Sequence, residues 1–351
     1  MTRATTPLQE AADNRRERMQ HILVAARERI VGRTRNGSEW QSFTTTPAGS
    51  LECLAINQDT TDRIWCGSFE DGLFHSVDGG TSFQQRGESV LESASVTSIA
   101  ISPSNPETIL VGTEPSNLYR SDSGGDDWEH VTDFSSIGSR DEWSFPPRPE
   151  THHVRWIAFH PTNPNHWYIG IEAGAFLVTT DGGETWTDRP PGSRRDNHWM
   201  ATHPAVPDRV YAAAGDGYAE SLDGGHTWSH PQEGLSHRYV WSVAVDPGDP
   251  ETRLVSAAKS ARQAHWKASA DAVIYRRTDQ DEWQQITDDV LPTGNGVRRY
   301  VLTSGTEPGE FAVAGNEGVF ISTDSGESWN SIPGTWDLEE SEAPVRGVVV
   351  G

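Results

Sequence analysis

The chain has 351 residues and a formal net charge of −23, and its only lysines are Lys259 and Lys267. A surface this acidic repels nucleic acids and anionic membranes, so we expect neither as a partner. The first 20 residues carry charges throughout and lack the apolar stretch that a signal peptide or a membrane span needs. We therefore expect a cytoplasmic protein. So much carboxylate with so little lysine is typical of halophilic proteins adapted to high intracellular salt, with an ordinary acidic protein as the alternative.

Residues 1–20 are interpreted as an N-terminal arm, and residues 21–351 as one domain built from repeats. Five segments of eight residues are nearly identical to one another. They are SVDGGTSF from Ser76, SDSGGDDW from Ser121, TTDGGETW from Thr179, SLDGGHTW from Ser221 and STDSGESW from Ser322. A repeat at intervals of roughly 40 to 50 residues predicts small sheets that must pack on one another, because none can bury its own faces.

An aromatic residue closes each repeat, and aligning these aromatics gives seven units. They are Trp40, Phe83, Trp128, Trp186, Trp228, Trp283 and Trp329. The chain ends in VRGVVVG, which matches the first strand of a unit, whereas the first unit begins at ILVAAR with its second strand. We therefore predict an all-β fold, a seven-bladed β-propeller. Its ring should be closed by pairing of the C-terminal strand with the N-terminal blade.

The repeated segments resemble the Asp-box, S-x-D-x-G-x-T-W, of sialidases, xyloglucanases, sortilin-type receptors and photosystem II assembly factors. The resemblance implies a propeller and is silent about activity. The carboxylate at the third position can accept backbone N–H groups of its own turn, and the glycines tolerate positive φ. We interpret Asp78, Asp181, Asp223 and Asp324 as structural residues, and we call the five segments the box turns.

The predicted loops divide between two faces of the ring. In a propeller the first strand of every blade lines the central channel. The box turns connect third to fourth strands and lie on what we call the bottom face. Two long insertions, residues 129–153 and 259–272, connect strands on the opposite, top face. A binding site is therefore expected at the top mouth of the channel.

Placing the first strands in register gathers basic and aromatic residues at this mouth. One level of the channel should hold Glu52, Thr97, Arg155, His198, Trp241, Arg298 and Arg346. Guanidinium groups suit carboxylates and phosphates, and aromatic rings stack on sugars. We expect a small anionic or carbohydrate-like ligand, or a protein partner, to bind there. The candidate ligand-binding residues are Arg155, His198, Trp241, Arg298, Arg346, His153, Arg238, Tyr239, Glu114 and Glu172.

Two other readings of this cluster stay open. Carboxylates of the same face, among them Glu114 and Glu172, can neutralise the arginines and make the cluster a structural charge network. Histidines can also hold a divalent metal together with Glu172 or Asp196, although the histidines expected at this mouth have no HxxxH spacing among them and the two cysteines form no CxxC. The candidates for such a metal site are His153, His198 and His237. No other cofactor is expected.

From about residue 21 to its end, the chain resembles uncharacterised Asp-box propeller proteins of archaea and actinobacteria that are labelled sialidase-like or glycosyl hydrolases. Segments such as GTEPSNLYRSDSGG and GIEAGAFLVTTDGGETW carry the resemblance. It implies an alternative function, a glycosidase-like sugar-acid hydrolase or lyase with or without a metal. A sialidase triad would use Arg155, Arg298 and Arg346, but sialidases have six blades and an Arg-Ile-Pro motif that this chain lacks. Our first hypothesis is binding without catalysis.

Overall fold

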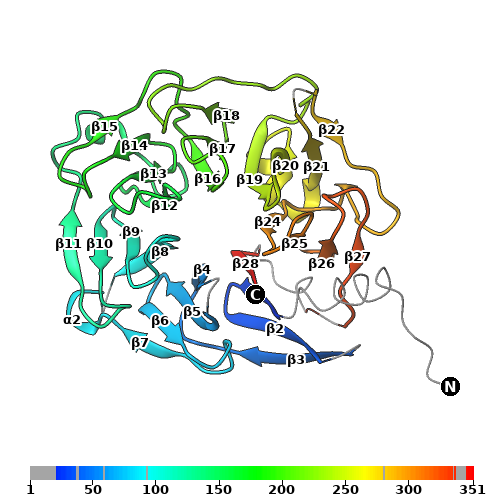
Figure 1. Ribbon diagram of the computed structural model, residues 1–351, viewed down its shortest axis with the longest axis horizontal. Coiled ribbons are helices and arrows are strands. Elements are labelled where there is room, and N and C mark those ends of the chain that lie inside the picture. Colours follow the sequence, from blue (N-terminus) through cyan, green and yellow to red (C-terminus); the bar gives the residue numbers. More distant parts are fainter. Residues whose placement is uncertain are drawn as a thin grey trace.

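A computed structural model describes residues 21–36, 39–57, 60–91, 94–279, 281–334, 336 and 345–351. The expected N-terminal arm, residues 1–20, lies outside the described residues. The described strands form seven small antiparallel sheets in a ring around a central channel (Figure 1), which confirms the predicted seven-bladed β-propeller. No helix in the described part of the chain has the length and apolar character needed to cross a membrane.

The first four blades follow one another along the chain, and each has four strands. Blade 1 joins β28 (Gly347–Val350), β1 (His21–Ala26), β2 (Arg29–Asn36) and β3 (Glu39–Thr45). Blade 2 contains β4 (Leu51–Asn57), β5 (Thr60–Ser68), β6 (Gly72–Ser76) and β7 (Gln84–Arg86). Blade 3 contains β8 (Ser95–Ile101), β9 (Ile109–Glu114), β10 (Leu118–Ser121) and β11 (Glu129–Thr132). Blade 4 contains β12 (Val154–Phe159), β13 (Trp167–Ile171), β14 (Ala175–Thr179) and β15 (Thr187–Asp188).

Of the last three blades, two depart from the four-stranded pattern. Blade 5 contains β16 (Asn197–Thr202), β17 (Val210–Ala214) and β18 (Gly217–Ser221), and a bridge between Glu220 and Ser229 stands in place of a fourth strand. Blade 6 contains β19 (Tyr239–Asp246), β20 (Asp249–Ala258), β21 (Asp271–Arg277) and β22 (Gln284–Gln285), and β23 (Gly294–Asn295) pairs with β21. Blade 7 contains β24 (Val301–Ser304), β25 (Phe311–Gly315), β26 (Gly318–Ser322) and β27 (Asn330–Ser331). The short helical segments are α2 (Glu88–Leu91), η1 (Arg140–Glu142), α3 (Ala261–His265) and η2 (Lys267–Ser269).

Ring closure joins strands from opposite ends of the described chain. β28 pairs antiparallel with β1, and Ile22 lies opposite Val350 while Ala25 lies opposite Gly347. Val348 and Val350 are buried. The pairing covers an edge of β1 that would otherwise be open to another chain. The predicted closure is therefore confirmed.

Four of the five box turns are held by the aspartate at their third position. In blade 4 the Asp181 carboxylate accepts the backbone N–H of Thr185 at 2.9 Å, the hydroxyl of Thr185 at 2.5 Å and the hydroxyl of Thr179 at 2.7 Å. Gly183 has a φ of 94°, a conformation that side chains rarely adopt. The same three bonds are made by Asp78, Asp223 and Asp324. Both oxygens of each of these carboxylates accept hydrogen bonds within their own turn, in keeping with a structural role.

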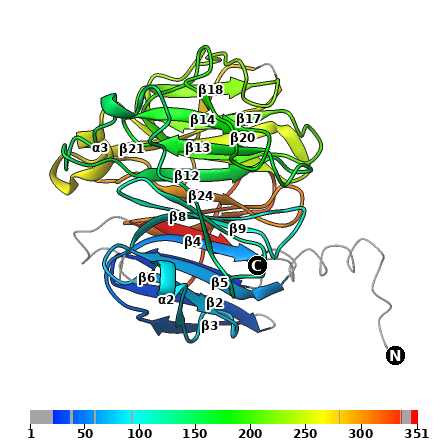
Figure 2. The same cartoon turned by 90° about the vertical axis from the view of Figure 1, so that its left-hand side faces the viewer.

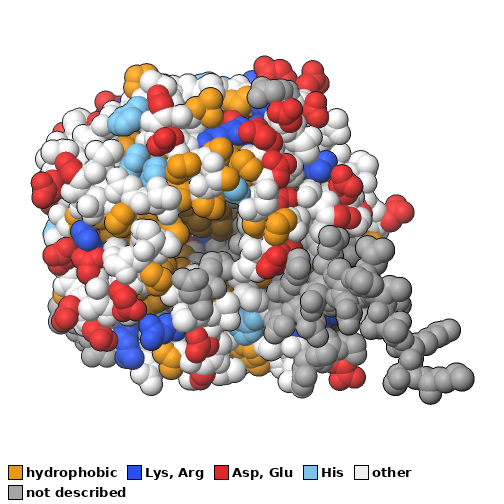
Figure 3. All heavy atoms as spheres, viewed as in Figure 1, with side chains coloured by type: hydrophobic (Ala, Val, Ile, Leu, Met, Phe, Trp, Pro, Cys, Tyr) orange, Lys and Arg blue, Asp and Glu red, His pale blue; other side chains and the backbone are white. Residues whose placement is uncertain are grey.

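The box turns lie at the same end of the blades as the turns between first and second strands. The Gly182 N–H donates to the carbonyl of Asn165 at 2.8 Å, and the Gly224 N–H donates to the carbonyl of Asp208 at 2.8 Å. The helix α3 follows a second strand, so it lies at the opposite end, on the left in Figure 2. Figures 1 and 3 therefore look onto the bottom face.

The core lies between neighbouring blades. Between blades 4 and 5, Tyr168 and Phe176 pack against Met200 and Val210, and all four are buried. Burying an aromatic or large aliphatic side chain stabilises a fold by about 1.5–3 kcal/mol. Each blade depends on its neighbours for this burial, so the blades stabilise one another in the closed ring. The first strands, which line the channel, are therefore held in fixed positions.

Candidate functional site

The first strands of blades 2 to 6 each contain a bulge at one level of the channel. The register with the second strand shifts between Leu51 and Cys53, Val96 and Ser98, Val154 and Trp156, Asn197 and Trp199, and Val240 and Ser242. A bulge inserts one residue and re-aims its side chain. The residues inside the five shifts are Glu52, Thr97, Arg155, His198 and Trp241. The structure thus places them at one level, as the sequence register predicted.

Blade 7 departs from that register. β24 pairs with β25 without a shift. Arg299 lies against the channel residue Trp241, with its guanidinium carbon 3.6 Å from the ring centroid. Arg298 instead donates its backbone N–H to Asn316 at 2.7 Å, and the charge of Glu317 acts on its guanidinium. The channel level predicted for Arg298 belongs to Arg299, because β24 pairs without the register shift found in blades 2 to 6.

Trp241 is the centre of a buried group at the top end of the channel. The guanidinium carbons of Arg155 and Arg299 lie 4.9 and 3.6 Å from its ring centroid. The rings of His198 and His265 lie 4.6 and 4.7 Å away. Burial and the charge of Arg299 lower the pKa of His265 to about 2, so its ring is neutral. We call these five residues the plug cluster.

Two arginines at this level have carboxylate partners. Arg155 Nε lies 3.4 Å from Glu172 Oε2, and the same oxygen lies 3.0 Å from His153 Nε2. Arg346 Nη1 lies 3.2 Å from Glu52 Oε2. These pairs agree with the structural charge network that the sequence left open.

Arg299 differs from both. Its Nη1 donates to the carbonyl of Val345 at 3.1 Å and its Nε donates to His265 Nδ1 at 3.1 Å. Its buried Nη2 has no hydrogen-bond partner, and no ion pair joins Arg299 to a described carboxylate. Burial and the charges of Arg346 and Arg155 lower the pKa of Arg299 well below its ordinary value.

The carboxylates of Glu172 and Asp196 lie close together at this end, and their pKa values are shifted in opposite directions. Burial alone would raise the pKa of Glu172, but the His153 hydrogen bond and nearby positive charges, including Arg155, lower it well below its ordinary value. Burial and the Glu172 charge raise the pKa of Asp196, against the charge of His198. One carboxylate is thus held ionised while its neighbour takes up a proton more readily.

Both insertions place side chains within or beside the plug cluster at the top end of the channel. In residues 129–153, Phe145 packs on His153 with ring centroids 4.7 Å apart, and His153 shares Glu172 with Arg155. His265 of residues 259–272 packs on Trp241 and lies 2.9 Å from the Tyr239 hydroxyl. Arg155 and Trp241 are only 4% and 3% exposed. The sequence predicted that the insertions lie on this face. It could not predict which residues they contact there, because those contacts form only in the folded chain.

The remaining predicted site residues lie around the plug cluster. Glu114 accepts two bonds from Arg148 at 2.7 and 2.6 Å, so the insertion supplies its partner. His237 Nδ1 lies 2.6 Å from the Tyr275 hydroxyl. Arg238 is exposed in a shallow surface hollow outside the channel. Of the residues named from the sequence, Arg155, His153, His198, Trp241, Tyr239, Glu172 and Arg346 are brought together.

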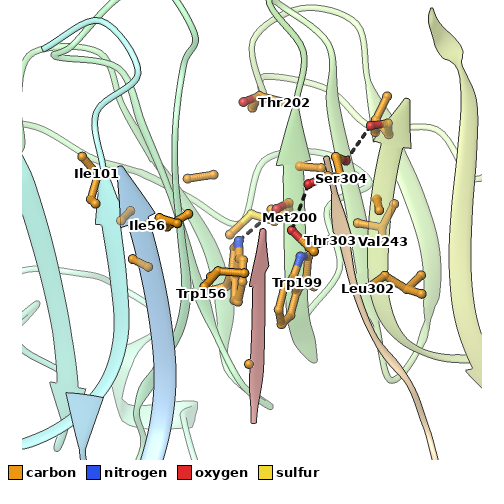
Figure 4. A pocket seen from close by; sticks show the side chains of 18 of the residues that line it. Ile56, Ile101, Trp156, Trp199, Met200, Thr202, Val243, Leu302, Thr303 and Ser304 are labelled. Atoms are coloured by element: carbon orange, nitrogen blue, oxygen red, sulfur yellow. Dashed lines mark hydrogen bonds between the residues drawn. The ribbon is translucent and has the colours of Figure 1, made fainter. Parts of the chain in front are cut away.

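A cavity of about 710 Å³ occupies the channel below the plug cluster. Its wall is built by residues that follow the bulges along the first strands, and it reaches the bottom-face turns at His203, Pro247 and Thr306. Figure 3 shows the hollow at the centre of that face, with hydrophobic side chains around it. Figure 4 labels part of the lining, namely Ile56, Ile101, Trp156, Trp199, Met200, Thr202, Val243, Leu302, Thr303 and Ser304.

The lining is apolar for the most part, with polar side chains such as Thr202, His203, Thr303 and Ser304 among it. Trp156 and Trp199 stack with ring centroids 3.5 Å apart, and Trp156 Nε1 donates to the carbonyl of Met200 at 2.9 Å. Among the described lining residues there is no Asp or Glu, and Arg346 is the only Arg or Lys. Arg346 lies at the inner end, with its side chain 24% exposed. The sequence analysis missed this cavity, although the alternating apolar residues of the first strands were a signal for it.

No protein-family model matches the chain. It is 23% identical over 152 residues to the oligoxyloglucan-reducing end-specific xyloglucanase of Emericella nidulans, which is 40% of this chain and 18% of that protein. The chain therefore spans less than a fifth of this curated relative.

Among solved structures, the chain is similar to an ancestral GH74 enzyme, with a TM-score of 0.63, 19% identity, and coverage of 83% of this chain and 39% of that one. It is similar to YCF48 bound to D1 peptide, with a TM-score of 0.58, 15% identity, and coverage of 87% and 91%. The GH74 xyloglucanase from Xanthomonas campestris gives a TM-score of 0.58, 16% identity, and coverage of 88% and 53%. These likenesses establish the fold alone: the chain is a seven-bladed β-propeller of the architecture found in GH74 enzymes and in YCF48.

Proposed function

We propose that this protein is a binding propeller whose central channel receives, from the bottom face, an apolar segment of a protein partner that carries an anionic group. The observation that carries the proposal is the cavity of about 710 Å³, walled by the first strands of all seven blades and lined for the most part by apolar side chains. This volume falls within the range of about 300–1,000 Å³ that is usual for ligand sites.

The chemistry of the wall favours apolar and aromatic groups. Ile101, Leu302 and the stacked indoles of Trp156 and Trp199 offer surface that water solvates poorly. Each CH₂ group buried against such a wall contributes about 0.8 kcal/mol. An apolar peptide side chain entering from the bottom face gains this energy without breaking a hydrogen bond of the wall.

Arg346 supplies a cation at the inner end of the cavity. Its Nη1 pairs with Glu52, but its buried Nε has no hydrogen-bond partner. A carboxylate or sulfonate reaching this depth can accept from that group, and such charge-assisted bonds contribute about 1.5–3 kcal/mol. The proposed ligand group is therefore apolar with an anionic end.

Two further observations support binding over hydrolysis in this channel. Glycoside hydrolysis uses a pair of carboxyl groups, and none lines the cavity among the described residues. The likeness to the peptide-bound YCF48 extends over 91% of that chain, whereas the GH74 enzymes are matched over 39% and 53% of theirs.

The test uses 8-anilinonaphthalene-1-sulfonate, a probe with an aromatic body and one anionic group. We expect one saturable site by fluorescence titration. Ala201→Trp, which fills the cavity, should abolish it, and Arg346→Met should weaken it about tenfold, as loss of one charge-assisted bond implies. The control is Leu222→Ser, because Leu222 is 70% exposed and outside the cavity. If Ala201→Trp bound the probe with unchanged affinity, the channel would be ruled out as the binding site. Peptides selected on the wild-type protein should compete with the probe.

A second candidate function rests on Glu172 and Asp196. Their pKa values are moved in opposite directions, as in the acid and base pairs of glycosidases. This arrangement favours the glycosidase-like alternative at the top end of the channel. Release of reducing sugar from xyloglucan oligosaccharides or aryl glycosides, lost in Asp196→Asn, would support it. If neither class of substrate were hydrolysed, this second candidate function would be ruled out.

A further inference from the structure

We propose that Glu172, Asp196 and His198 form a binding site for one divalent metal ion of the zinc class. His198 Nε2 lies 3.6 Å from Asp196 Oδ1 and 3.9 Å from Glu172 Oε1. One ligand atom from each of the three residues lies within 4.8 Å of the others. Two ligands bound at about 2.1 Å to a tetrahedral ion lie about 3.4 Å apart, so small movements would complete the site. The proposal is independent of what enters the channel.

The strongest evidence is the placement of the His198 ring. The residue is 0% exposed. Its Nδ1 lies 2.8 Å from the carbonyl of Val240, which can only accept, so Nδ1 donates there and Nε2 is the ring nitrogen that remains for an ion. Nε2 is buried without a hydrogen-bond partner. A backbone carbonyl that fixes the tautomer in this way is the usual arrangement behind a metal-binding histidine.

The surroundings of Nε2 call for a cation. Two carboxylate oxygens lie near Nε2, and a buried polar atom without a partner costs about 1–3 kcal/mol. The three atoms lie too far apart to bond one another directly. An ion between Nε2, Glu172 Oε1 and Asp196 Oδ1 would give each of them a bond.

Outer contacts hold both carboxylates in place. Glu172 Oε2 is bonded to His153 at 3.0 Å and paired with Arg155 at 3.4 Å, which leaves Oε1 for an ion. Asp196 Oδ1 accepts the backbone N–H of Ala173 at 3.0 Å. Partners of this kind orient metal ligands and typically change metal affinity 10- to 100-fold when removed.

The residue types and their exposure indicate the class of ion. One imidazole and two carboxylates suit Zn²⁺ and Co²⁺, whereas Mg²⁺ and Ca²⁺ prefer oxygen ligands alone. The Asp196 side chain is 33% exposed and that of Glu172 is 12% exposed. Solvent therefore reaches the triad through Asp196, so that water can fill the remaining coordination positions.

The test is a titration of the 351-residue chain with ZnCl₂ after dialysis against EDTA. We expect one equivalent bound by isothermal titration calorimetry, and a Co²⁺ absorption spectrum of a four- or five-coordinate ion. His198→Gln and Asp196→Asn should each lower the affinity at least thirtyfold. Asp196→Asn preserves the shape of a side chain that is partly exposed, so we expect this variant to fold. Its zinc affinity therefore tests the proposal even if His198→Gln fails to fold.

A matched control lies on the bottom face. There the His160 and His166 rings lie 5.0 Å apart and His160 Nε2 lies 3.4 Å from Asp208 Oδ1, which makes this pair a competing surface site for zinc. His160→Gln should leave the one-equivalent binding unchanged. The proposal is overturned if neither Zn²⁺ nor Co²⁺ binds, or if binding is lost in His160→Gln and kept in both triad variants.

Discussion

The guanidinium carbon of Arg299 lies 3.6 Å from the centroid of the Trp241 ring, although the two residues come from different blades and both are buried. No described carboxylate forms an ion pair with Arg299. A buried charge without an opposite charge costs stability that the cation–π contact offsets only in part. This contact therefore holds a cation at the top of the channel at the expense of the stability of the fold.

The first prediction contrasts Arg299 with a paired arginine. We expect Arg299→Met to leave the free energy of unfolding unchanged or to raise it by about 1 kcal/mol, because it removes an unpaired buried charge. Arg253 Nε lies 2.8 Å from Glu220, so Arg253→Met should lower it by about 3 kcal/mol. Urea denaturation of the two variants measures both effects. Equal losses would show that the carboxylate partner does not decide the outcome.

The second prediction concerns ring closure. Deleting residues 345–351 removes β28, whose Val348 and Val350 are buried, and leaves the edge of β1 unpaired. We expect a melting temperature lowered by more than 10 °C or loss of cooperative unfolding in calorimetry. The control is a chain with a short Gly-Ser extension after Gly351, which should melt like the parent. Cooperative melting of the deletion variant at the parent temperature would contradict the role of this strand.

The third prediction compares two box turns. Asp181 accepts three hydrogen bonds, whereas Ser123, at the same position of the blade 3 box turn, accepts the backbone N–H of Asp127 at 2.8 Å. Asp181→Ala should lower the free energy of unfolding by about 1 kcal/mol, because its carboxylate is partly solvated, and Ser123→Ala should lower it by less. Thermal melts in identical buffer measure the difference. A larger loss in Ser123→Ala would argue against the carboxylate as the stabilising group.

The fourth prediction is a pH dependence with two windows. Burial and the charge of His160 lower the pKa of His166 to about 4, and burial and the charge of Arg86 lower that of His75 to about 4. An unfolded histidine has a pKa of about 6.5, so between pH 6.5 and 4 the unfolded chain binds more protons. The free energy of unfolding should therefore fall as the pH drops through this range.

The second window lies at lower pH. Hydrogen bonds from Thr185 hold the pKa of Asp181 at about 2, and bonds from Thr227 outweigh burial to hold that of Asp223 at about 2. Their stabilisation is present above about pH 3.9, where unfolded aspartate ionises, and is lost as the pH falls towards 2. Urea titrations at pH 7, 5, 4 and 3 separate the windows. His166→Gln, which keeps a donor for the carbonyl of Gly224, should reduce the slope of the upper window, to which His75 still contributes, and leave the lower window unchanged.

The sequence predicted the channel level of Arg155, His198 and Trp241, because repeat symmetry places equivalent residues at equal height. It misplaced Arg298, since the missing bulge of blade 7 depends on how β24 pairs with β25. It also could not place His265, which reaches Trp241 from an insertion. A bulge or an insertion leaves no regular pattern of apolar residues, so neither could be positioned by periodicity.

The sequence by itself determined the number of blades, the closure of the ring and the faces on which the box turns and the insertions lie. These features arise from short-range patterns, such as the hydrogen bonds of Asp181 within its own turn, that repeat along the chain. Only the tertiary structure decided which side chains meet at the top end of the channel. That outcome depends on Trp241, His265 and Arg299, which come from three separate segments and pack together once the ring has formed.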